Sequence, residues 1–490
     1  MLGWMNPLES QARIEELTKR IESLRRENER LQRDNQRIEK ENQRIEKEKN
    51  RLREERDRLK QELDLARRAS KRQAAPFSKG EPKADPKRAG RKKGKAYGKK
   101  AHRPVPETVD EEVEVAGPPT SPCCDSTIDN VHIEDQYQAE IVRKTHVTRF
   151  RIHVGNCHKC GKRVQGRDPK QTSDAVGAAA SQIGPEALSL AAMLNKQLGI
   201  PLGKTTTVLQ QAFGLSLTPG GLSQALTRMA AQCEPTYQNL ITQVRSAASV
   251  TMDESGWRVG GRLWWLWPAV SDDTTIYGIL PGRGYKQAVQ LLGEDFDAFL
   301  IHDGWSIYYQ FLHAYHQSCN RHLINRCDLL LENATPATAV FPRNVKAILL
   351  KGLDLRDRYA QGQLSDHGLA SVTGKLEAEL IRLIDRDYRN DPNRKLAKHL
   401  CHEFPYLFTY LKCPGLEATN WRGEQAIRPA VVARKVWGGN RTPNGAHAQE
   451  ILTSVFRTSR QRDCDVMSEL SGLLRSPEPF VLDFSRPVRC

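Results

Sequence analysis

Two aspartates, each directly after a short apolar stretch, are well placed to do chemistry. Asp253 follows residues 247–252 (AASVTM), and Asp303 follows residues 298–302 (AFLIH). Both stretches are typical of buried strands. Carboxylates at two neighbouring strand ends are the ligands that a pair of hard divalent cations needs. Taken singly, either aspartate could instead cap the turn or helix that follows it.

A third carboxylate, Glu424, lies in a segment rich in cations. Asn420 could cap a helix whose first turn contains Glu424, and Pro429 should end or kink that helix. We expect Glu424 to complete a set of three acids, and the alternative is a surface ion pair with a neighbouring arginine. The cations beside it, where a polyanion would pass, are Arg422, Arg428, Arg434 and Lys435.

Two other glutamates compete with Glu424 for the third position. Glu254 follows Asp253 directly, so its side chain should point to the opposite face of the strand. Glu450 lies on a later helix and stays open as a replacement.

The elements around the acids predict the fold. Residues 261–271 (GRLWWLWPAVS) and 274–281 (TTIYGILP) indicate two further strands, with a tight turn at Gly260–Gly261 before the first. Residues 286–292 (KQAVQLL) indicate a helix before the strand that ends at Asp303. This order, with acids after the first and fourth strands, is the outline of a ribonuclease-H-like α/β fold, in which those two strands are neighbours.

Composition indicates a polyanionic partner. The chain of 490 residues carries a net charge of +16 and has a pI near 9.3, which favours nucleic acid over a merely soluble basic protein. No run of eighteen apolar residues occurs, and no export signal is visible at the N-terminus. Eleven unevenly spaced cysteines favour a reducing cytoplasm over a disulfide framework.

Four of the cysteines predict a zinc-ribbon-like module over residues 120–170. Cys157 and Cys160 form a Cys-x-x-Cys pair that suits tetrahedral zinc. Cys123 and Cys124 stand where the other half belongs, although adjacent cysteines ligate less comfortably. Residues between the two pairs alternate like a hairpin. The alternatives are a structural Zn²⁺ and a ribbon that folds without metal.

Eight heptads in one phase predict a coiled coil within residues 1–66. With Ile14 at position a, the d positions run from Leu17 to Ala66 and are all Leu, Ile or Ala. A buried Asn at position a pairs best with its twin, which favours a parallel homodimer over a single solvated helix. The asparagines at position a are Asn28, Asn35 and Asn42.

Two segments connect the coiled coil and the acids. Residues 67–119 are rich in Lys, Arg, Gly and Pro and predict a disordered basic linker. The linker either adds salt-sensitive contacts to DNA phosphates or serves only as a solubilising tether. Residues 180–240 predict three short helices, with a turn at Gly214 and a third helix capped by Thr218 and started by Pro219. This outline is helix-turn-helix-like, and either DNA binding or packing would explain it.

From about Cys123 to Arg462 the chain resembles a known family, the bacterial insertion-sequence transposases of the IS66 family. The matching segments are MDESGW at Asp253, IHDGWSIYY at Asp303, HQSCNRHLINR around Cys319 and WRGEQAIRPAVVARKVW around Glu424.

The resemblance implies a DDE triad on Asp253, Asp303 and Glu424, with two Mg²⁺ (or Mn²⁺) ions as cofactors. It also implies a catalytic domain at about 246–460 with a helical insertion at about 325–415, which leaves residues 461–490 as a tail. The implied partners are the terminal inverted repeats of the element, target DNA and a second copy, with no membrane, in the bacterial cytoplasm and associated with the nucleoid.

The sequence departs from the family pattern in three places. Gln425 stands where Arg is usual, and residues 121–124 read Ser-Pro-Cys-Cys rather than Cys-Pro-x-Cys. Between Cys319 and His322 an Asn-Arg pair replaces the typical Trp-Ala. Cys319 and His322 could share a metal or hold the insertion against the core.

The implied activity is DNA strand cleavage and strand transfer at the ends of an insertion sequence. Two Mg²⁺ ions roughly 4 Å apart would activate a water and then a 3′ hydroxyl, with the acids as ligands. No covalent protein–DNA intermediate is then expected. The alternatives are a catalytically decayed DNA-binding or regulatory relative, and a nuclease of the same fold that cuts without joining.

Overall fold

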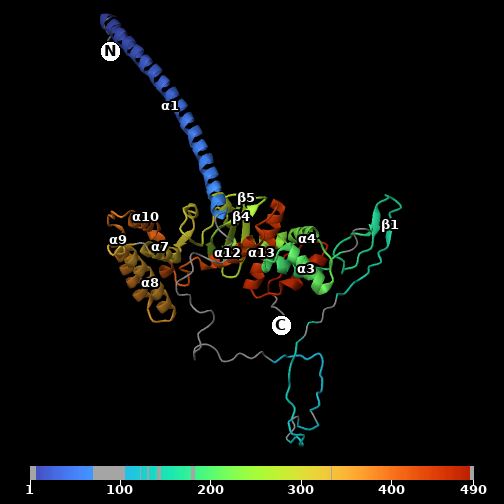
Figure 1. Ribbon diagram of the computed structural model, residues 1–490. Helices are drawn as coiled ribbons and strands as arrows, with labels where there is room; N and C mark the ends of the chain where they lie inside the picture. Colours follow the sequence, from blue (N-terminus) through green and yellow to red (C-terminus); the bar gives the residue numbers. More distant parts are fainter. Residues whose placement is uncertain are drawn as a thin grey trace. The chain divides into compact units, whose positions relative to one another are not determined.

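The computed structural model divides into two compact units, Met1–Val105 and Pro106–Cys490 (Figure 1). The expected linker of residues 67–119 lies largely outside the described residues. Those described are 7–69, 105–117, 119–121, 123–129, 132–139, 141, 145–177, 182–332 and 334–485.

The first unit contains one long helix, α1, which runs from Pro7 to Ala69 (Figure 1). Its length and continuity agree with the predicted heptads. Four described apolar side chains of the a and d positions are 52–57% exposed, namely Ile21, Leu24, Leu31 and Ile45. Apolar side chains in a regular column on an otherwise charged helix are what a second helix would cover, so pairing with another copy stays a prediction.

The second unit contains a mixed sheet of six strands within its described residues. These strands are β3 (Ser249–Met252), β4 (Ser255–Val259), β5 (Arg262–Val270), β6 (Thr275–Leu280), β7 (Phe299–His302) and β8 (Tyr315–Ser318). β3, β7 and β8 are parallel to one another, whereas β4, β5 and β6 form antiparallel pairs. The sequence predicted four of these strands and missed β4 and β8.

The pairing along β5 gives the spatial order of the sheet. β6 pairs with residues 265–270 of β5, β4 pairs with residues 262–266, and β3 pairs with Ala269 and Val270. Because these stretches overlap, β6 occupies one edge of β5, and β3 and β4 share the other. Gly260 and Gly261, both with positive φ, form the predicted tight turn between β4 and β5.

Helices cover both faces of the sheet. The larger core joins one face, through residues such as Val250, Met252 and Trp267, to helices before, within and after the sheet region. These helices are α2 (Pro185–Ala192) with its π-helical extension η2 (Met193–Gln197), α3 (Leu202–Phe213), α4 (Pro219–Gln232), α5 (Glu234–Arg245), α6 (Tyr285–Leu292), α13 (Pro443–Gln461) and α14 (Val466–Arg475). α12 (Trp421–Trp437) packs on the other face through Ala426.

The stretch between β8 and α12 is helical and has a core of its own, with residues such as Leu349, Leu376 and Leu400 buried. Its helices are α7 (Asn320–Glu332), α8 (Val340–Ala360), α9 (Asp366–Ile384), α10 (Asp391–Glu403) and α11 (Thr409–Lys412), with short 3₁₀ turns at Tyr308–Gln310 (η3) before β8 and at Phe404–Tyr406 (η4) after α10.

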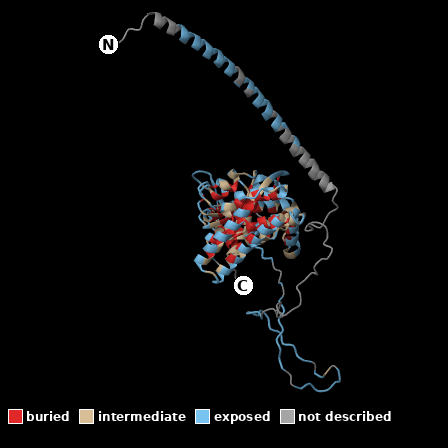
Figure 2. Ribbon diagram, turned by 90° about the vertical axis from the view of Figure 1, so that its left-hand side faces the viewer, coloured by how far each residue is buried: buried red, intermediate tan, exposed pale blue. Residues whose placement is uncertain are grey.

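The segments that flank the sheet and the insertion differ in how far they contribute to the larger core. Thr218 caps α4 by accepting from the Gly221 N–H, and Pro219 starts the helix, as predicted. Leu222, Leu226 and Met229 of α4 are buried in the larger core, so one face of the helix-turn-helix-like segment packs. The expected tail, residues 461–490, includes α14, which also packs there through Leu470. By contrast, described side chains before Gln171 are exposed or half-buried (Figure 2).

Candidate active site

The parallel pair β3 and β7 brings the two aspartates together. Thr251 pairs with Ile301 in this ladder, and the same offset of 50 positions separates Asp253 from Asp303. Each aspartate is the first residue after its strand. Because parallel strands end at the same edge of a sheet, the two carboxylates leave neighbouring strand ends in the same direction.

The hydrogen bonds of the aspartates are local. One oxygen of Asp253 accepts from the Glu254 N–H at 2.8 Å, and one oxygen of Asp303 accepts from the Trp305 N–H at 3.0 Å. Burial raises the pKa of Asp253 to about 8, helped by the charges of Glu254, Asp303 and Glu424. A carboxyl held among other carboxylates in this way gains most from a cation that neutralises them.

α12 carries Glu424 to the same place. Glu424 lies in the first turn of α12, as predicted. The residue before it, Gly423, is buried against β3: a methyl group there would lie 3.2 Å from the Asp253 Cβ and 3.2 Å from a methyl carbon of Thr251. Glycine therefore allows α12 to approach the strand closely, a requirement that the sequence analysis missed.

The cap of α12 differs in detail from the prediction. Asn420 occupies the position before the helix, but its side chain makes no capping hydrogen bond. The helix also continues through Pro429 to Trp437 instead of ending there. Ala426 and Ala433, on either side of the proline, are buried, and this packing on the sheet outweighs the hydrogen bond that proline removes.

The donor set of the three acids fits Mg²⁺, which prefers carboxylate oxygens. Within the described residues, no three side chains of His, Cys, Asp or Glu are gathered closely enough to hold a metal ion. Glu424 instead faces His322, with 3.7 Å between its Oε1 and the imidazole Nε2. The three carboxyl groups share one end of the sheet without being drawn together around a common point.

Glu254 points away from α12, the direction expected from strand alternation. Its side chain is 1% exposed and pairs with Arg283 at 2.5 Å. The Tyr308 hydroxyl donates to its other oxygen at 2.6 Å. The Arg283 guanidinium also lies over the Trp305 ring, 3.9 Å from its centroid. Both carboxylate oxygens of Glu254 are thus bonded, one to Arg283 and one to Tyr308. These contacts fix the end of the strand next to Asp253.

Glu450, which the sequence left open as an alternative to Glu424, forms structural contacts. It accepts from the Ile279 N–H at 2.6 Å, and Ser454 and Thr458 accept in the same way from Tyr277 and Thr275. Three side chains spaced four positions apart on α13 therefore bond the outer edge of β6. Glu450 lies beside β6, where its carboxylate is bonded to the Ile279 N–H.

A chain of imidazoles supports the turn after Asp303. His316 Nε2 donates to the Phe311 carbonyl, so in the neutral ring its Nδ1 accepts from His302 Nε2 at 3.2 Å. His302 Nδ1 then accepts from the Gly304 N–H at 3.0 Å. Burial lowers the pKa of both imidazoles, which keeps them in the neutral form that this chain requires.

Cys319 lies directly before α7 and His322 lies in its first turn, beside the start of α12. The Cys319 thiol is buried, and its sulfur accepts from the Asn420 N–H at 3.3 Å. Burial raises the pKa of this thiol to about 11, which disfavours the thiolate that a metal would require. The contact supports the alternative in which Cys319 holds the insertion against the core.

The four expected cations differ in their surroundings. Arg422 pairs with Asp272 at 3.2 Å and with Glu417 at 3.7 Å, and Arg434 donates to the Ser255 hydroxyl at 3.2 Å. Arg428 and Lys435 are exposed on α12.

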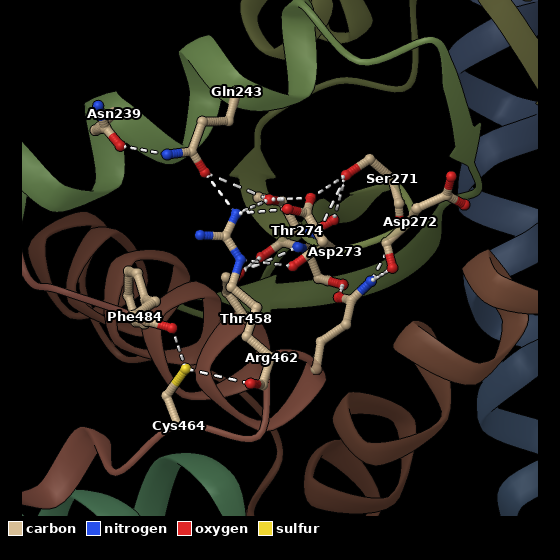
Figure 3. A network of polar contacts seen from close by, with 12 residues as sticks. Asn239, Gln243, Ser271, Asp272, Asp273, Thr274, Thr458, Arg462, Cys464 and Phe484 are labelled. Carbon is tan, nitrogen blue, oxygen red and sulfur yellow. Dashed lines mark hydrogen bonds and ion pairs between the residues drawn. The ribbon is translucent and has the colours of Figure 1, made fainter. Parts of the chain in front are cut away.

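The β5–β6 turn that holds Asp272 is itself anchored by Arg462, the residue directly after α13. Figure 3 shows the Arg462 guanidinium reaching this turn, where it donates to the Asp273 carbonyl at 3.0 Å and to the Thr274 hydroxyl at 2.6 Å.

The predicted zinc cysteines lie in two separate turns. Cys157 and Cys160 form the loop between β1 (Val154–Asn156) and β2 (Arg163–Gln165), where the Gly161 N–H donates to the Cys157 carbonyl at 2.8 Å. Hydrogen bonds led by Ser126 lower the pKa of Cys124 to about 7. The described residues hold no cluster of three metal ligands, so zinc at Cys123, Cys124, Cys157 and Cys160 stays a prediction.

Comparison with known families identifies the chain. Residues 180–448, which are 269 of the 490 positions (448 − 180 + 1), match the Transposase IS66 family. The chain belongs to the IS66 family of transposases. The matched part of this transposase includes Asp253, Asp303 and Glu424, whereas α1 and the β1–β2 hairpin precede it. None of the curated proteins with which the chain was compared matches it. No helix in the described part of the chain is long and apolar enough to cross a membrane.

Proposed function

We propose that this transposase carries out Mg²⁺-dependent DNA strand cleavage and strand transfer at the ends of an insertion sequence. Asp253, Asp303 and Glu424 are the proposed metal ligands, on a ribonuclease-H-like core. The activity would take place in the bacterial cytoplasm, at the nucleoid, with the terminal repeats and target DNA as substrates.

The strand order supports the ribonuclease-H-like assignment. Three antiparallel strands, β3, β5 and β6, are followed by two strands parallel to β3, and the sequence of neighbours is β6, β5, β3, β7 and β8. This is the arrangement expected when acids after the first and fourth strands of such a core are to meet.

One observation carries the proposal. Asp253 and Asp303 follow neighbouring parallel strands at the same offset, and Gly423 lets α12 pack against Asp253 with Glu424 in the next position. The glycine lies where the helix that carries the third acid contacts the strand end that carries the first.

The chain's own residues would bind the reacting DNA strand and the divalent cations. Bound divalent cations would supply a polarised water or 3′ hydroxyl and stabilise charge on the phosphate. The three carboxylates would hold those cations, and Arg428 and Lys435, which are exposed, would contact the phosphate backbone of bound DNA. Arg422, which pairs with Asp272, and Arg434, which donates to Ser255, are proposed to contact the same backbone.

The experiment compares amide variants of each acid with a matched control. D253N, D303N and E424Q should each abolish Mg²⁺-dependent cleavage and joining of DNA that carries the inverted repeats flanking the gene, while DNA binding is kept. The control is D297N, which changes an exposed carboxylate six positions before Asp303 and should retain activity. Full activity in any of the three amide variants would refute the triad, and a wild-type protein that binds DNA without cutting it would indicate a decayed relative.

A further inference from the structure

A cationic hollow lies on the helical insertion, and none of the four cations around α12 lines it. Its volume is about 600 Å³. One lining residue comes from α7 and five come from α10. They are Arg326, Lys395, Lys398, His399, Cys401 and His402.

The charge of this hollow is only partly compensated. Lys395 pairs with Asp391 at 2.6 Å. In the described part of the chain, neither Arg326 nor Lys398 takes part in an ion pair, and no carboxylate lines the hollow. Burial and the charge of Arg326 lower the pKa of His399 to about 4, so the imidazole is neutral at pH 7. Arg326 and Lys398 are therefore two free cations from two helices facing one space.

The two helices that line the hollow also contact the acid site. Glu403, at the end of α10, lies against Gly304: a methyl group at that glycine would be 2.7 Å from the Glu403 Oε2. Asp303 is near enough to act on the pKa of His399. On α7, His322 faces Glu424 at 3.7 Å, and Arg326 lies one helical turn further along. The hollow and the acids are thus neighbouring surfaces joined by rigid elements.

We propose that this hollow binds a backbone phosphate of the DNA strand that reacts at Asp253 and Asp303, next to the phosphate undergoing chemistry. The inference rests on the proposed function. A cluster of carboxylates repels a phosphodiester chain, and a cationic site beside it offsets that repulsion and fixes the position of the strand. A guanidinium and an ammonium converging from two helices are suitable donors for phosphate oxygens.

The test removes two charges from the hollow and, as a control, two charges from elsewhere on the same insertion. The full chain is titrated with a duplex carrying one end of the element, without divalent cations, over a range of salt concentrations. R326Q/K398Q should weaken binding on the order of tenfold and reduce the slope of log affinity against log salt by about 1. K351Q/K375Q changes two exposed lysines on α8 and α9 and should leave both quantities within about twofold of wild type.

The outcomes separate the hollow from the function. If the two double variants lose DNA affinity equally, or if neither loses any, the phosphate site is refuted. Binding and cleavage of DNA by the wild type would still support the transposase activity. A wild type that does not bind the duplex would refute both. Binding of inorganic phosphate by the wild type but not by R326Q/K398Q, with unchanged DNA affinity, would assign the hollow to free phosphate and also overturn the proposal. Thermal unfolding of each variant checks that the fold is intact.

Discussion

Around Asp303, hydrogen bonds hold the backbone turn that presents the carboxylate. The Gly304 N–H is fixed by His302, and Gly304 also has a positive φ of 84°. The Glu403 carboxylate fills the space beside this glycine and accepts from the Ser318 hydroxyl. The direction in which Asp303 leaves its strand therefore depends on buried groups from β8 and α10.

This dependence predicts a loss of stability in mild acid. An unfolded histidine titrates near pH 6.5, whereas burial places the folded pKa of His302 well below that value. The contribution of the neutral ring is complete above pH 6.5. As pH falls from there towards the folded pKa, only the unfolded chain gains the proton, so the free energy of unfolding drops by about 1.4 kcal/mol per pH unit for one imidazole.

Urea unfolding at several pH values between 8 and 5 measures this slope. H302N keeps an acceptor for the Gly304 N–H but has no proton to gain, so its slope should be smaller by about one proton even though the variant is less stable at pH 8. A variant with the wild-type slope would show that other groups cause the acid sensitivity.

At the residue scale, the sequence predicted the acids but not their surroundings. Asp253, Asp303 and Glu424 became candidates because each stands at a fixed place in a local pattern, and their role as metal ligands stays a prediction. The pairs His302–His316 and Glu254–Arg283 join residues 14 and 29 positions apart, and no periodicity marks them. No local pattern marks the contact between Gly423 and Asp253 either, because it depends on how α12 packs against β3.

At the scale of elements, the packing of α12 on β3 determines whether the third acid reaches the other two. Replacing Gly423 by a residue with a side chain should push α12 away from β3. G423A must displace neighbours by a few tenths of an ångström, because its methyl group would lie 3.2 Å from the Asp253 Cβ. G423V requires a larger shift, and a displacement near 1 Å can cost on the order of a hundredfold in rate.

Cleavage rates of a glycine series test this relation. We expect wild type to be fastest, G423A slower and G423V slowest, with DNA affinity nearly constant. Gly374 provides the control, because it lies inside α9 and has nothing within 4 Å of an added methyl group. G374A and G374V should leave cleavage unchanged. Equal rates for G423V and G374V would show that the approach of α12 is not limiting.

Element by element, strong local patterns were predictable and tertiary contacts were not. The Thr218 cap and the Gly260–Gly261 turn depend on short-range chemistry and agree with the structure. β8 was missed because Tyr315–Ser318 contains no run of apolar residues. The continuation of α12 beyond Pro429 was missed because packing, rather than helix propensity, decides it.

At the scale of the whole molecule, α1 carries an apolar column that a second copy of the chain would cover. Under the proposed function, such pairing would bring two copies to the two ends of an element. We expect a parallel dimer through this helix. Replacing Leu24, Leu31 and Ile45 together by Glu should give monomers in sedimentation, because three charges would enter the apolar seam. The matched control adds the same three charges outside the a and d positions, as S23E/Q36E/Q43E, and should remain dimeric. A wild type that is monomeric at micromolar concentration would refute the prediction.

The division of the second unit was only partly visible in the sequence. The family resemblance implied a helical insertion between the second and third acids, but not that it buries a separate set of leucines. The expected tail proved to contain α14, because Leu470 and Leu473 complete a core begun by α2 about 280 positions earlier. Contacts at such separation leave no local signature in composition.

The bonding of β6 by α13 has a consequence for how copies of the chain can associate. A strand at the edge of a sheet normally presents free N–H groups that recruit strands from other molecules. Here the N–H groups of Thr275, Tyr277 and Ile279 are taken by Thr458, Ser454 and Glu450. The helix thereby closes that edge to strand addition and protects the protein from aggregating through its sheet.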